Sequence, residues 1–222
     1  MKQAKRILVL LLSLMLLISA LSACSKKNDD AQPNASASPS ESAETTEETA
    51  APERENGERF EGVIMIEGME ETIKLEHVIN ETAGFAMDYD YEGFVRQSAS
   101  DRERFVWAYD DPDNPENYIE VSFRSEDAES VADEIEQSLA ENYEIYRDTA
   151  TLTSGLECIR MDASAVPGGA YSADVLQAVY VIPAADGCRV AQIRYLPEGS
   201  DGFGMRLAFL VNTITVMEAK AA

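Results

Sequence analysis

Between residues 25 and 57 the chain contains no aromatic and no branched aliphatic residue, so this stretch cannot contribute to a hydrophobic core. Ser, Ala, Thr, Glu, Pro, Asn and Asp dominate it, and such a composition buries too little apolar surface to offset the entropy lost on folding. We therefore expect a disordered acidic linker that spans roughly 30 Å as a flexible coil. The folded core must come from residue 58 onward.

An apolar run before the linker is typical of an export signal. Lys2, Lys5 and Arg6 give it a basic start, and residues 7–20 are apolar apart from serines. A membrane-spanning helix needs about 20 apolar residues, and this run is shorter and is soon followed by charged residues. The pattern favours a cleaved signal peptide over a permanent membrane span.

The end of this run, Leu21, Ser22, Ala23 and Cys24, resembles the lipobox of bacterial lipoproteins. The resemblance implies transfer of a diacylglyceryl group to the Cys24 sulfur and cleavage after Ala23. Residues 1–23 would then be the signal peptide, and acylated Cys24 would hold residues 24–57 and the domain at the extracytoplasmic face of the cell membrane. Two acyl chains anchor stably, whereas one binds only marginally. The alternative is an ordinary signal peptide in which small residues happen to precede a cysteine.

The charge balance excludes polyanions as partners. Loss of Lys2, Lys5 and Arg6 would leave 15 of the 18 basic residues against 41 acidic ones, so the formal charge would change from −23 to −26. Nucleic acids and anionic headgroups bind to clustered Lys and Arg, and the basic residues after residue 57 are scattered. Basic proteins or cations are the partners that such a charge attracts.

Residues 58–218 are long enough for one domain with its own core, followed by a short tail at 219–222. Period-two alternation and turn residues predict strands at 63–67, 72–79, 84–90, 103–109, 118–124, 144–149, 155–163, 174–183 and 188–196. The first two strands should form a hairpin through a turn at 68–70, and the last two a hairpin through 184–187. Both alternating sets of side chains in 176–182 are largely apolar, which predicts a central strand covered on both sides.

Two stretches have helical periodicity. Apolar residues between 126 and 142 recur at spacings of three and four, with acids on the opposite face and Ser125 or Asp127 as the N-cap. A closing helix is expected over 200–213. The order of strands, helix, strands and helix predicts an α+β fold with an antiparallel sheet flanked by two helices.

The segment at 84–94, the helix after Ser125 and the segment at 180–195 before a closing helix together resemble the PsbP-like fold. This resemblance covers about residues 84–216 and implies a PsbP-like sandwich. Better known members of the fold bind or assemble other proteins, so the resemblance implies a noncatalytic role, although fold alone does not transmit function. Asp90 and Phe94 stand where the family has its usual proline and tryptophan, so no functional residue is carried over.

Few residues here could carry catalytic or metal chemistry. His77 is the only histidine, it lies in a predicted strand, and no nucleophile-elbow sequence is present, so we interpret it as a solvent-facing residue. A single histidine and two cysteines after Cys24, without Cys-x-x-Cys spacing, argue against a zinc site. We expect no phosphate loop and no cofactor, because the glycines at 199–204 lack the required lysine.

The acidic segment at 110–117 is the one candidate cation loop. Asp111, Asp113, Asn114 and Glu116 offer the oxygen ligands that Ca²⁺ takes, but two prolines and the lack of the turn glycine match no EF-hand register. A solvated acidic turn is the favoured interpretation, with calcium affinity no tighter than millimolar.

Two further groups of residues have alternative interpretations. Phe105, Trp107 and Tyr109 form either an exposed protein-binding face or, as we favour, a row packed under a helix. Cys158 and Cys188 could form a disulfide in an exported chain. A simple strand meander would instead place them two strands apart, roughly 10 Å, so we predict two free, largely buried thiols.

Three classes of function remain open. We favour a noncatalytic envelope lipoprotein that binds or helps to assemble an extracytoplasmic protein. A small-ligand or cation-binding lipoprotein is the second, and it would need a preformed pocket with convergent polar groups. A hydrolase is the third, and it would need a cleft that holds His77 beside a carboxylate and a serine.

Overall fold

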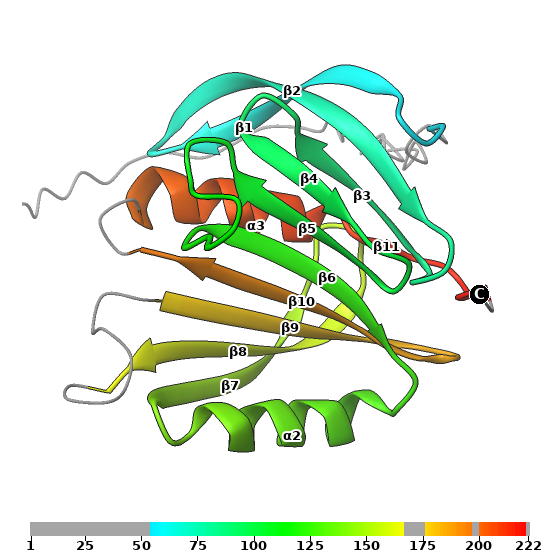
Figure 1. Cartoon of the computed structure of the whole chain (residues 1–222), viewed down its shortest axis with the longest axis vertical. Coiled ribbons are helices and arrows are strands. Elements are labelled where there is room, and N and C mark those ends of the chain that lie inside the picture. The colour runs from blue at the N-terminus through cyan, green and yellow to red at the C-terminus, as the bar shows by residue number, and fades with distance from the viewer. Residues whose placement is uncertain (1–53, 167–175, 197–199, 221–222) are drawn as a thin grey trace, which may run out of the picture. The chain divides into compact units, whose positions relative to one another are not determined.

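The domain consists of two antiparallel sheets. A computed structural model describes residues 54–166, 176–196 and 200–220, and the expected signal peptide, Cys24 and nearly all of the linker lie outside these ranges. One sheet has the strand order β1-β2-β3-β11 and the other β4-β5-β6-β10-β9-β8-β7 (Figure 1). The strands are β1 (Arg59–Ile66), β2 (Met69–Asn80), β3 (Phe85–Asp90), β4 (Phe94–Ser98), β5 (Arg102–Trp107), β6 (Tyr118–Arg124), β7 (Tyr143–Thr151), β8 (Glu157–Ala165), β9 (Leu176–Ala184), β10 (Gly187–Tyr195) and β11 (Thr215–Val216). The helical elements are α2 (Ala128–Leu139), the π-helical turn η2 (Ser200–Gly204) and α3 (Met205–Asn212).

The prediction of a single sheet is wrong, because the chain changes sheets between β3 and β4. Asp90 Oδ1 accepts hydrogen bonds from the backbone N–H groups of Glu92 and Gly93, each at 3.2 Å, and this side-chain turn redirects the backbone. A Cβ at Gly93 would lie 2.7 Å from Asp90 Oδ2 and 3.1 Å from the Trp107 ring, so only glycine fits there. β4 then pairs with β5 instead of extending the first sheet. The sequence patterns had not indicated β4 or β11.

The first hairpin was predicted correctly, but its turn is shorter than expected. Ile66 pairs directly with Met69, so the turn consists of Glu67 and Gly68 and not of residues 68–70. Both turn residues have positive φ, 52° and 80°, which is the backbone geometry that two-residue hairpin turns require. β1 begins four residues before its predicted range and ends one residue short of it, and β2 extends beyond its predicted range at both ends.

β8, β9 and β10 form the predicted meander. β9 lies between β8 and β10, and Val181 pairs with Ile159 on one side and with Val190 on the other. In this register Tyr180 lies opposite Arg160 on β8 and Ala191 on β10. The buried side chains of β9 are Ala178, Val179, Tyr180, Val181 and Ile182, which confirms a strand covered on both faces.

Helix α2 matches its prediction and covers the outer face of the seven-stranded sheet. Asp127 is the N-cap, and its carboxylate accepts the N–H of Ser130 at 3.0 Å. Val131 and Ala132 are buried against β8 and β9. On the β7 side, Arg147 reaches three acidic side chains of the helix, which fastens it along its length.

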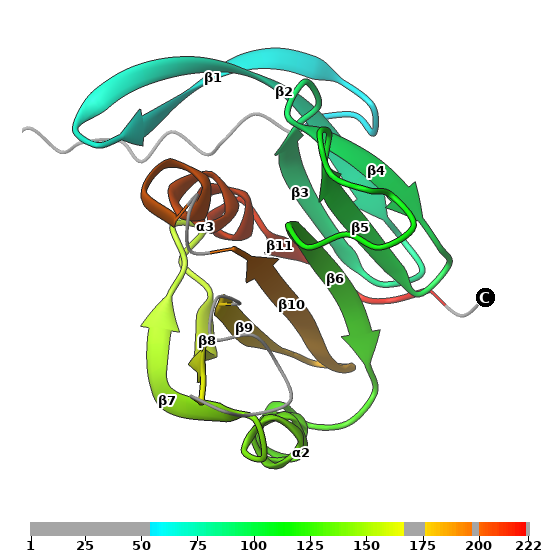
Figure 2. The same cartoon turned by 60° about the vertical axis from the view of Figure 1, so that its left-hand side comes forward.

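The closing helix is divided, with the wide turn η2 preceding a regular α3. Leu207, Leu210 and Val211 are fully buried in the core that also contains Ile182 of β9. α3 also contacts β1 and β3, and Figure 2 shows it between the β1–β2 hairpin and β10. It therefore fills the space between the two sheets and does not flank a single sheet. Neither α2 nor α3 is long and apolar enough to cross a bilayer.

One fully buried cation joins the two sheets. Arg189 of β10 has no exposed surface, and its guanidinium donates to the carbonyl oxygens of Gly84 (3.0 Å) and Met217 (2.6 Å). Asp186 Oδ1 accepts from Arg189 Nη1 at 2.5 Å, and Asp186 Oδ2 accepts the N–H of Ala219 at 2.7 Å. These bonds tie the β9–β10 turn to the start of β3 and to the C-terminal segment.

One buried carboxylate lies at the same end of the core, near the β2–β3 turn. Glu103 of β5 is 1% exposed, and it accepts both N–H groups of Arg96 at 2.8–2.9 Å. Ser98 Oγ and Asn80 Nδ2 donate to the same carboxylate at 2.9 and 3.0 Å. The charge is thus paired and hydrogen-bonded, which is the condition for burying it.

Candidate functional site

A groove with several polar lining residues opens where β2, β3 and β11 meet the β7–β8 turn and the C-terminal end of α3. Its volume is about 840 Å³, within the range of small-molecule sites. Residues 54 and 55, which precede β1, complete the rim. Six polar lining residues matter for its chemistry: His77, Asp88, Thr153, Ser154, Asn212 and Thr213.

His77 is paired with a carboxylate and is not the solvent-facing residue that the sequence predicted. It lies directly opposite Asp88 on the neighbouring strand, and its Nδ1 is 2.6 Å from Asp88 Oδ1. The two side chains are 16% and 17% exposed. An ionised carboxylate can only accept, so Nδ1 carries the hydrogen of this bond. This is the arrangement in which a carboxylate orients a histidine for use as a base or a ligand.

Most other polar groups of the groove are occupied by the fold itself. Asn212 Oδ1 accepts both the N–H and the hydroxyl of Thr153, at 3.0 and 3.2 Å. Thr213 Oγ1 accepts the N–H of Asp88 at 3.0 Å and lies 2.7 Å from the Leu210 carbonyl oxygen. These bonds leave few convergent groups for a small ligand.

Ser154 lines the groove but is not bonded to His77. It is exposed in the turn between β7 and β8, and the described residues provide no hydrogen bond between its hydroxyl and the imidazole. The groove therefore holds His77 beside a carboxylate and a serine, as the hydrolase hypothesis requires. A nucleophile–base hydrogen bond is missing.

The acidic segment at 110–117 uses its carboxylates to hold its own backbone. Asp110 Oδ2 accepts the N–H groups of Glu116 and Asn117, each at 2.7 Å, and Asp111 Oδ1 accepts that of Asp113 at 3.0 Å. In the ranges that the structure describes, no three acidic, histidine or cysteine side chains are grouped as metal ligands. The geometry is that of a carboxylate-stabilised turn.

The aromatic row is divided between core and surface. Phe105 is fully buried, whereas Tyr109, beyond the end of β5, is 84% exposed. Trp107 is partly buried, and its ring packs edge-on against Phe203 of η2 with centroids 4.9 Å apart. The favoured packing under a helical element therefore holds for Trp107 and is wrong for Tyr109, whereas the Phe105 ring packs against Tyr89 of β3 in the core.

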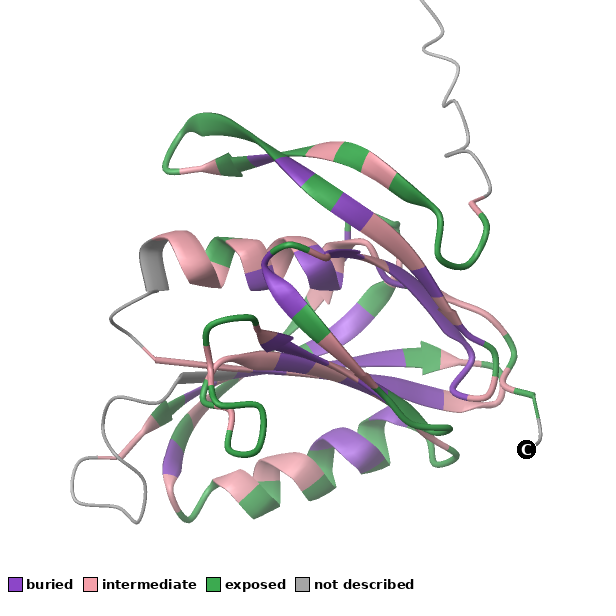
Figure 3. Ribbon diagram, turned by 45° about the horizontal axis from the view of Figure 1, so that its top comes forward, coloured by how far each residue is buried: buried purple, intermediate pink, exposed green. Residues whose placement is uncertain are grey.

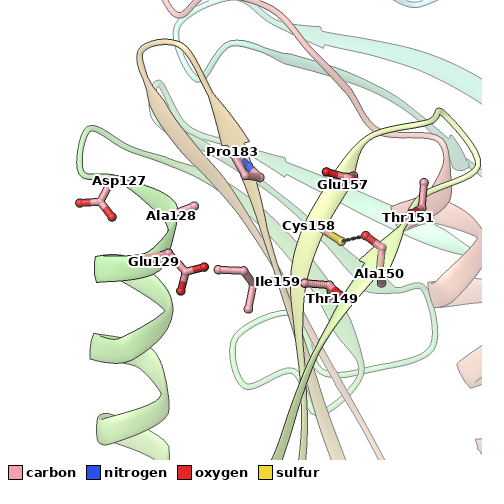
Figure 4. Close-up of a pocket in the computed structure, with 10 residues that line it drawn as sticks. All are labelled: Asp127, Ala128, Glu129, Thr149, Ala150, Thr151, Glu157, Cys158, Ile159 and Pro183. Atoms are coloured by element: carbon pink, nitrogen blue, oxygen red, sulfur yellow. Dashed lines mark hydrogen bonds between the residues drawn. The ribbon is translucent and has the colours of Figure 1, made fainter.

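Cys158 lies at a second, smaller pocket beside the start of α2 (Figure 4). Its volume is about 450 Å³, and its lining includes Asp127, Glu129 and Glu157. The Cys158 thiol donates to the Ala150 carbonyl oxygen at 3.4 Å, and burial raises its pKa. A buried thiol with a raised pKa is a poor nucleophile.

A second surface of interest is the distal half of the first hairpin. β2 pairs with β3 only over 75–80, so residues 63–72 form a two-stranded ribbon that extends past the sheet. Three large apolar side chains are exposed on it: Val63 (57%), Met65 (48%) and Met69 (67%). Figure 3 shows exposed residues covering the end of this hairpin. On the underside, Ile64 and Ile73 are buried towards Phe209 of α3.

Sequence reasoning missed both features because each depends on register. Alternation placed Asp88 on the face of β3 opposite Phe85 and Met87, but it could not place Asp88 across from His77. Alternation along β1 also puts Val63 and Met65 on the face that carries the charged Glu61. This pattern weakly predicts that the two apolar side chains are exposed.

Comparison with known proteins supplies similarity of structure alone. No model of a known protein family matches the sequence, and no curated protein matches it. Among solved structures, the chain is similar to the cyanobacterial PsbP of Synechocystis sp. PCC 6803, with a TM-score of 0.46 and 8% identity, over 64% of this chain and 92% of that one. A protein from Bacteroides thetaiotaomicron VPI-5482 matches with a TM-score of 0.41 and 12% identity, over 64% and 48% of the two chains. The first belongs to the family that the sequence resembles, and neither score supports an argument about function.

Proposed function

We propose that this chain is a noncatalytic lipoprotein of the cell envelope that binds or helps to assemble another extracytoplasmic protein. The lipobox-like residues at 21–24 support acylation of Cys24 and anchoring at the outer face of the cell membrane. The linker at 25–57 lets the domain reach a partner away from the bilayer surface. As part of the same proposal, the two packed sheets are a PsbP-like sandwich.

The observation that carries the proposal is the apolar face of the ribbon at 63–72. Val63 and Met65 are exposed side by side on one face of an element that projects past its sheet, and Met69 is exposed at the end of the hairpin on the opposite face. A two-stranded ribbon is only marginally stable without further contacts, and an exposed apolar cluster on a projecting element is typical of a protein-binding surface. The mature chain's strong negative charge disfavours an anionic membrane surface as the occupant.

A crosslinking pull-down from intact cells tests the proposal. The membrane-anchored protein with Val63→Ser and Met65→Ser should lose the partner that the unaltered protein captures, because burial of these two side chains provides much of the contact. The matched control is Val95→Ser with Tyr146→Ser, which removes comparable exposed apolar groups elsewhere. Equal capture by both variants would contradict the proposed surface.

A hydrolase is the second candidate, since the groove brings His77, Asp88 and Ser154 to one site. In that reaction the Ser154 hydroxyl would attack a carbonyl carbon, and His77 Nε2 would take its proton while Asp88 holds the imidazole in orientation. The missing bond between Ser154 and His77 is the reason that this function ranks second. A small-ligand site in the same groove is weakened by the internal hydrogen bonds of Asn212 and Thr213.

Labelling with a fluorophosphonate probe separates the two candidates. A hydrolase would be labelled at Ser154, and the label would disappear in Ser154→Ala and fall strongly in His77→Gln. Our proposal expects no labelling of the unaltered protein. Stoichiometric labelling of Ser154 would contradict the proposed noncatalytic binding function and support a hydrolase.

A further inference from the structure

We infer that the partner supplies a basic, extended segment that joins the free edge of β1 as an additional strand. This inference rests on the proposed function, because it specifies the chemistry of the protein that the ribbon binds. It follows from three properties of β1: the direction of its free backbone groups, the side chains on the same residues, and the local charge.

The hydrogen bonds of β2 fix which of its residues face β1. The carbonyl oxygen of Lys74 accepts the N–H of Tyr91, so Lys74 faces away from β1. His77 bonds in the other direction, to the N–H of Gly57 and the carbonyl oxygen of Glu58. Since the N–H and C=O of one residue point to the same side of an antiparallel strand and alternate along it, odd-numbered residues of β2 face β1.

The pairing register of β1 and β2 then identifies the backbone N–H and C=O groups of β1 that do not bond to β2. Lys74 lies opposite Glu61, so this is a non-hydrogen-bonded pair, and Glu61 points its N–H and C=O away from β2. By alternation the same holds for Arg59, Val63 and Met65. Within the described ranges β1 has β2 as its one neighbour, so these groups form an unpaired edge. Such an edge is a template for an added strand.

The residues with free backbone groups are also those whose side chains point outward. Arg59, Glu61, Val63 and Met65 are all exposed, whereas Ile64 between them is buried. An added strand would therefore gain main-chain hydrogen bonds at four residues and lie beside two exposed apolar side chains. The other long edge, β7, has one large exposed apolar side chain, Tyr146, whose hydroxyl lies 3.5 Å from Asp148.

The charge around the ribbon selects a basic segment. Glu61, Glu67 and Glu70 are exposed and form no salt bridge with any residue in the described part of the chain. Of the cations near the ribbon, Arg59 pairs with Glu76 and Lys74 with Glu92, each at 2.7 Å, and Arg54 lies over the Phe60 ring, 3.8 Å from its centroid. Glu61 lies opposite Lys74, whereas Glu67 and Glu70 lie at the hairpin end, and exposed carboxylates beside an apolar centre attract lysine and arginine and repel acidic strands.

Amide hydrogen exchange with a synthetic probe tests strand addition directly. The probe is a capped heptapeptide that alternates lysine and valine, and its control replaces each lysine by glutamate. We expect the lysine peptide to slow exchange about tenfold or more at Glu61, Val63 and Met65, the residues whose amides would donate to it. Exchange at Gly62 and Ile64 should change much less, and raising the salt concentration should weaken the effect. Unchanged exchange at Glu61, Val63 and Met65 at high peptide concentration, or an equal effect of the glutamate peptide, would overturn the inference.

A proline variant provides an independent test. Val63→Pro removes one outward N–H and leaves the β1–β2 bonds intact, because proline is tolerated at a strand edge whose N–H faces solvent. Gly62, which precedes it, has no Cβ to clash with the proline ring. The folded variant should lose protection by the lysine peptide, whereas Val63→Ala should retain most of it. Protection that survives in the folded proline variant would contradict pairing at this edge.

The two proposals fail in different ways. If the Val63→Ser, Met65→Ser protein loses its cellular partner but the peptide gives no protection at β1, the partner docks through side chains and the strand-addition inference is wrong. If the peptide protects β1 but no cellular partner depends on the ribbon, the edge can accept an added strand and the proposed function is wrong.

Discussion

Cys158 and Cys188 lie on opposite faces of the seven-stranded sheet, on β8 and β10, with β9 between them. Cys158 belongs to the core between the two sheets, and Cys188 to the core beneath α2. Both thiols are free and buried in the structure. A disulfide would require the sheet to break, since its Cα atoms must approach within about 7 Å and its side chains must point towards each other.

We therefore predict that both cysteines are alkylated only after unfolding. Burial raises the pKa of the Cys158 thiol and raises that of Cys188 to about 11, so little thiolate is present at pH 8. Mass spectrometry after iodoacetamide treatment should find slow modification of the native protein and complete modification in denaturant. A Cys158–Cys188 crosslinked peptide from unreduced protein would contradict the structure.

Removal of the buried carboxylate should be strongly destabilising. Glu103→Ala leaves Arg96, Ser98 and Asn80 without their shared acceptor, and we expect the free energy of unfolding to fall by about 3 kcal/mol in a urea titration. Glu81→Ala is the control, because Glu81 and its partner Lys220 are 60% and 67% exposed, and it should cost less than about 1 kcal/mol. Equal effects of the two substitutions would show that the Glu103 network adds no stability.

The Asp186 carboxylate should make stability depend on acid pH. Its hydrogen bonds to Arg189 lower its pKa from 3.8 to about 2. A carboxyl group whose pKa is lower in the folded state contributes its full stabilisation at pH values above its unfolded-state pKa. That contribution is lost as the pH falls towards the folded-state pKa. Asp186→Asn should therefore reduce the free energy of unfolding by roughly 1–2 kcal/mol at pH 7, after allowance for solvent screening. The difference from the unaltered protein should shrink between pH 4 and pH 2, and a difference that is constant over this interval would count against the ion pair.

Cys24→Ala tests the anchor. The variant should leave the membrane fraction and appear in the soluble envelope fraction or the medium, because acylation of Cys24 is the proposed means of attachment. Fractionation and immunoblotting measure this, with Cys158→Ala as the control that should stay in the membrane. Retention of Cys24→Ala in the membrane would refute the lipid anchor.

The sequence was most informative where one periodicity governs an element. Alternation located β3, β6, β9 and β10 to within a few residues, and the spacing of Val131 and Ile135 located α2, with Asp127 one of its two candidate caps. These patterns are local, so they can be read without knowing which strands are neighbours.

Properties that depend on pairing could not be read from the sequence. The short turn after β3 moves β4 into a second sheet, and the His77–Asp88 pair exists only because two strands align in one register. The burial of Arg189 depends on acceptors from Gly84 and Met217, which are distant in sequence. Such contacts are tertiary, and strand propensity carries no information about them.

Site-specific photocrosslinking in living cells tests the central claim most directly. Benzoylphenylalanine placed at Met65 of the anchored protein should form a discrete crosslinked product with another envelope protein, because Met65 lies on the proposed binding ribbon. The same probe at Tyr146, which is 66% exposed on the far edge strand, should give no such product. A product at Tyr146 with none at Met65 would contradict the proposal that this protein works by binding a partner through the β1–β2 ribbon.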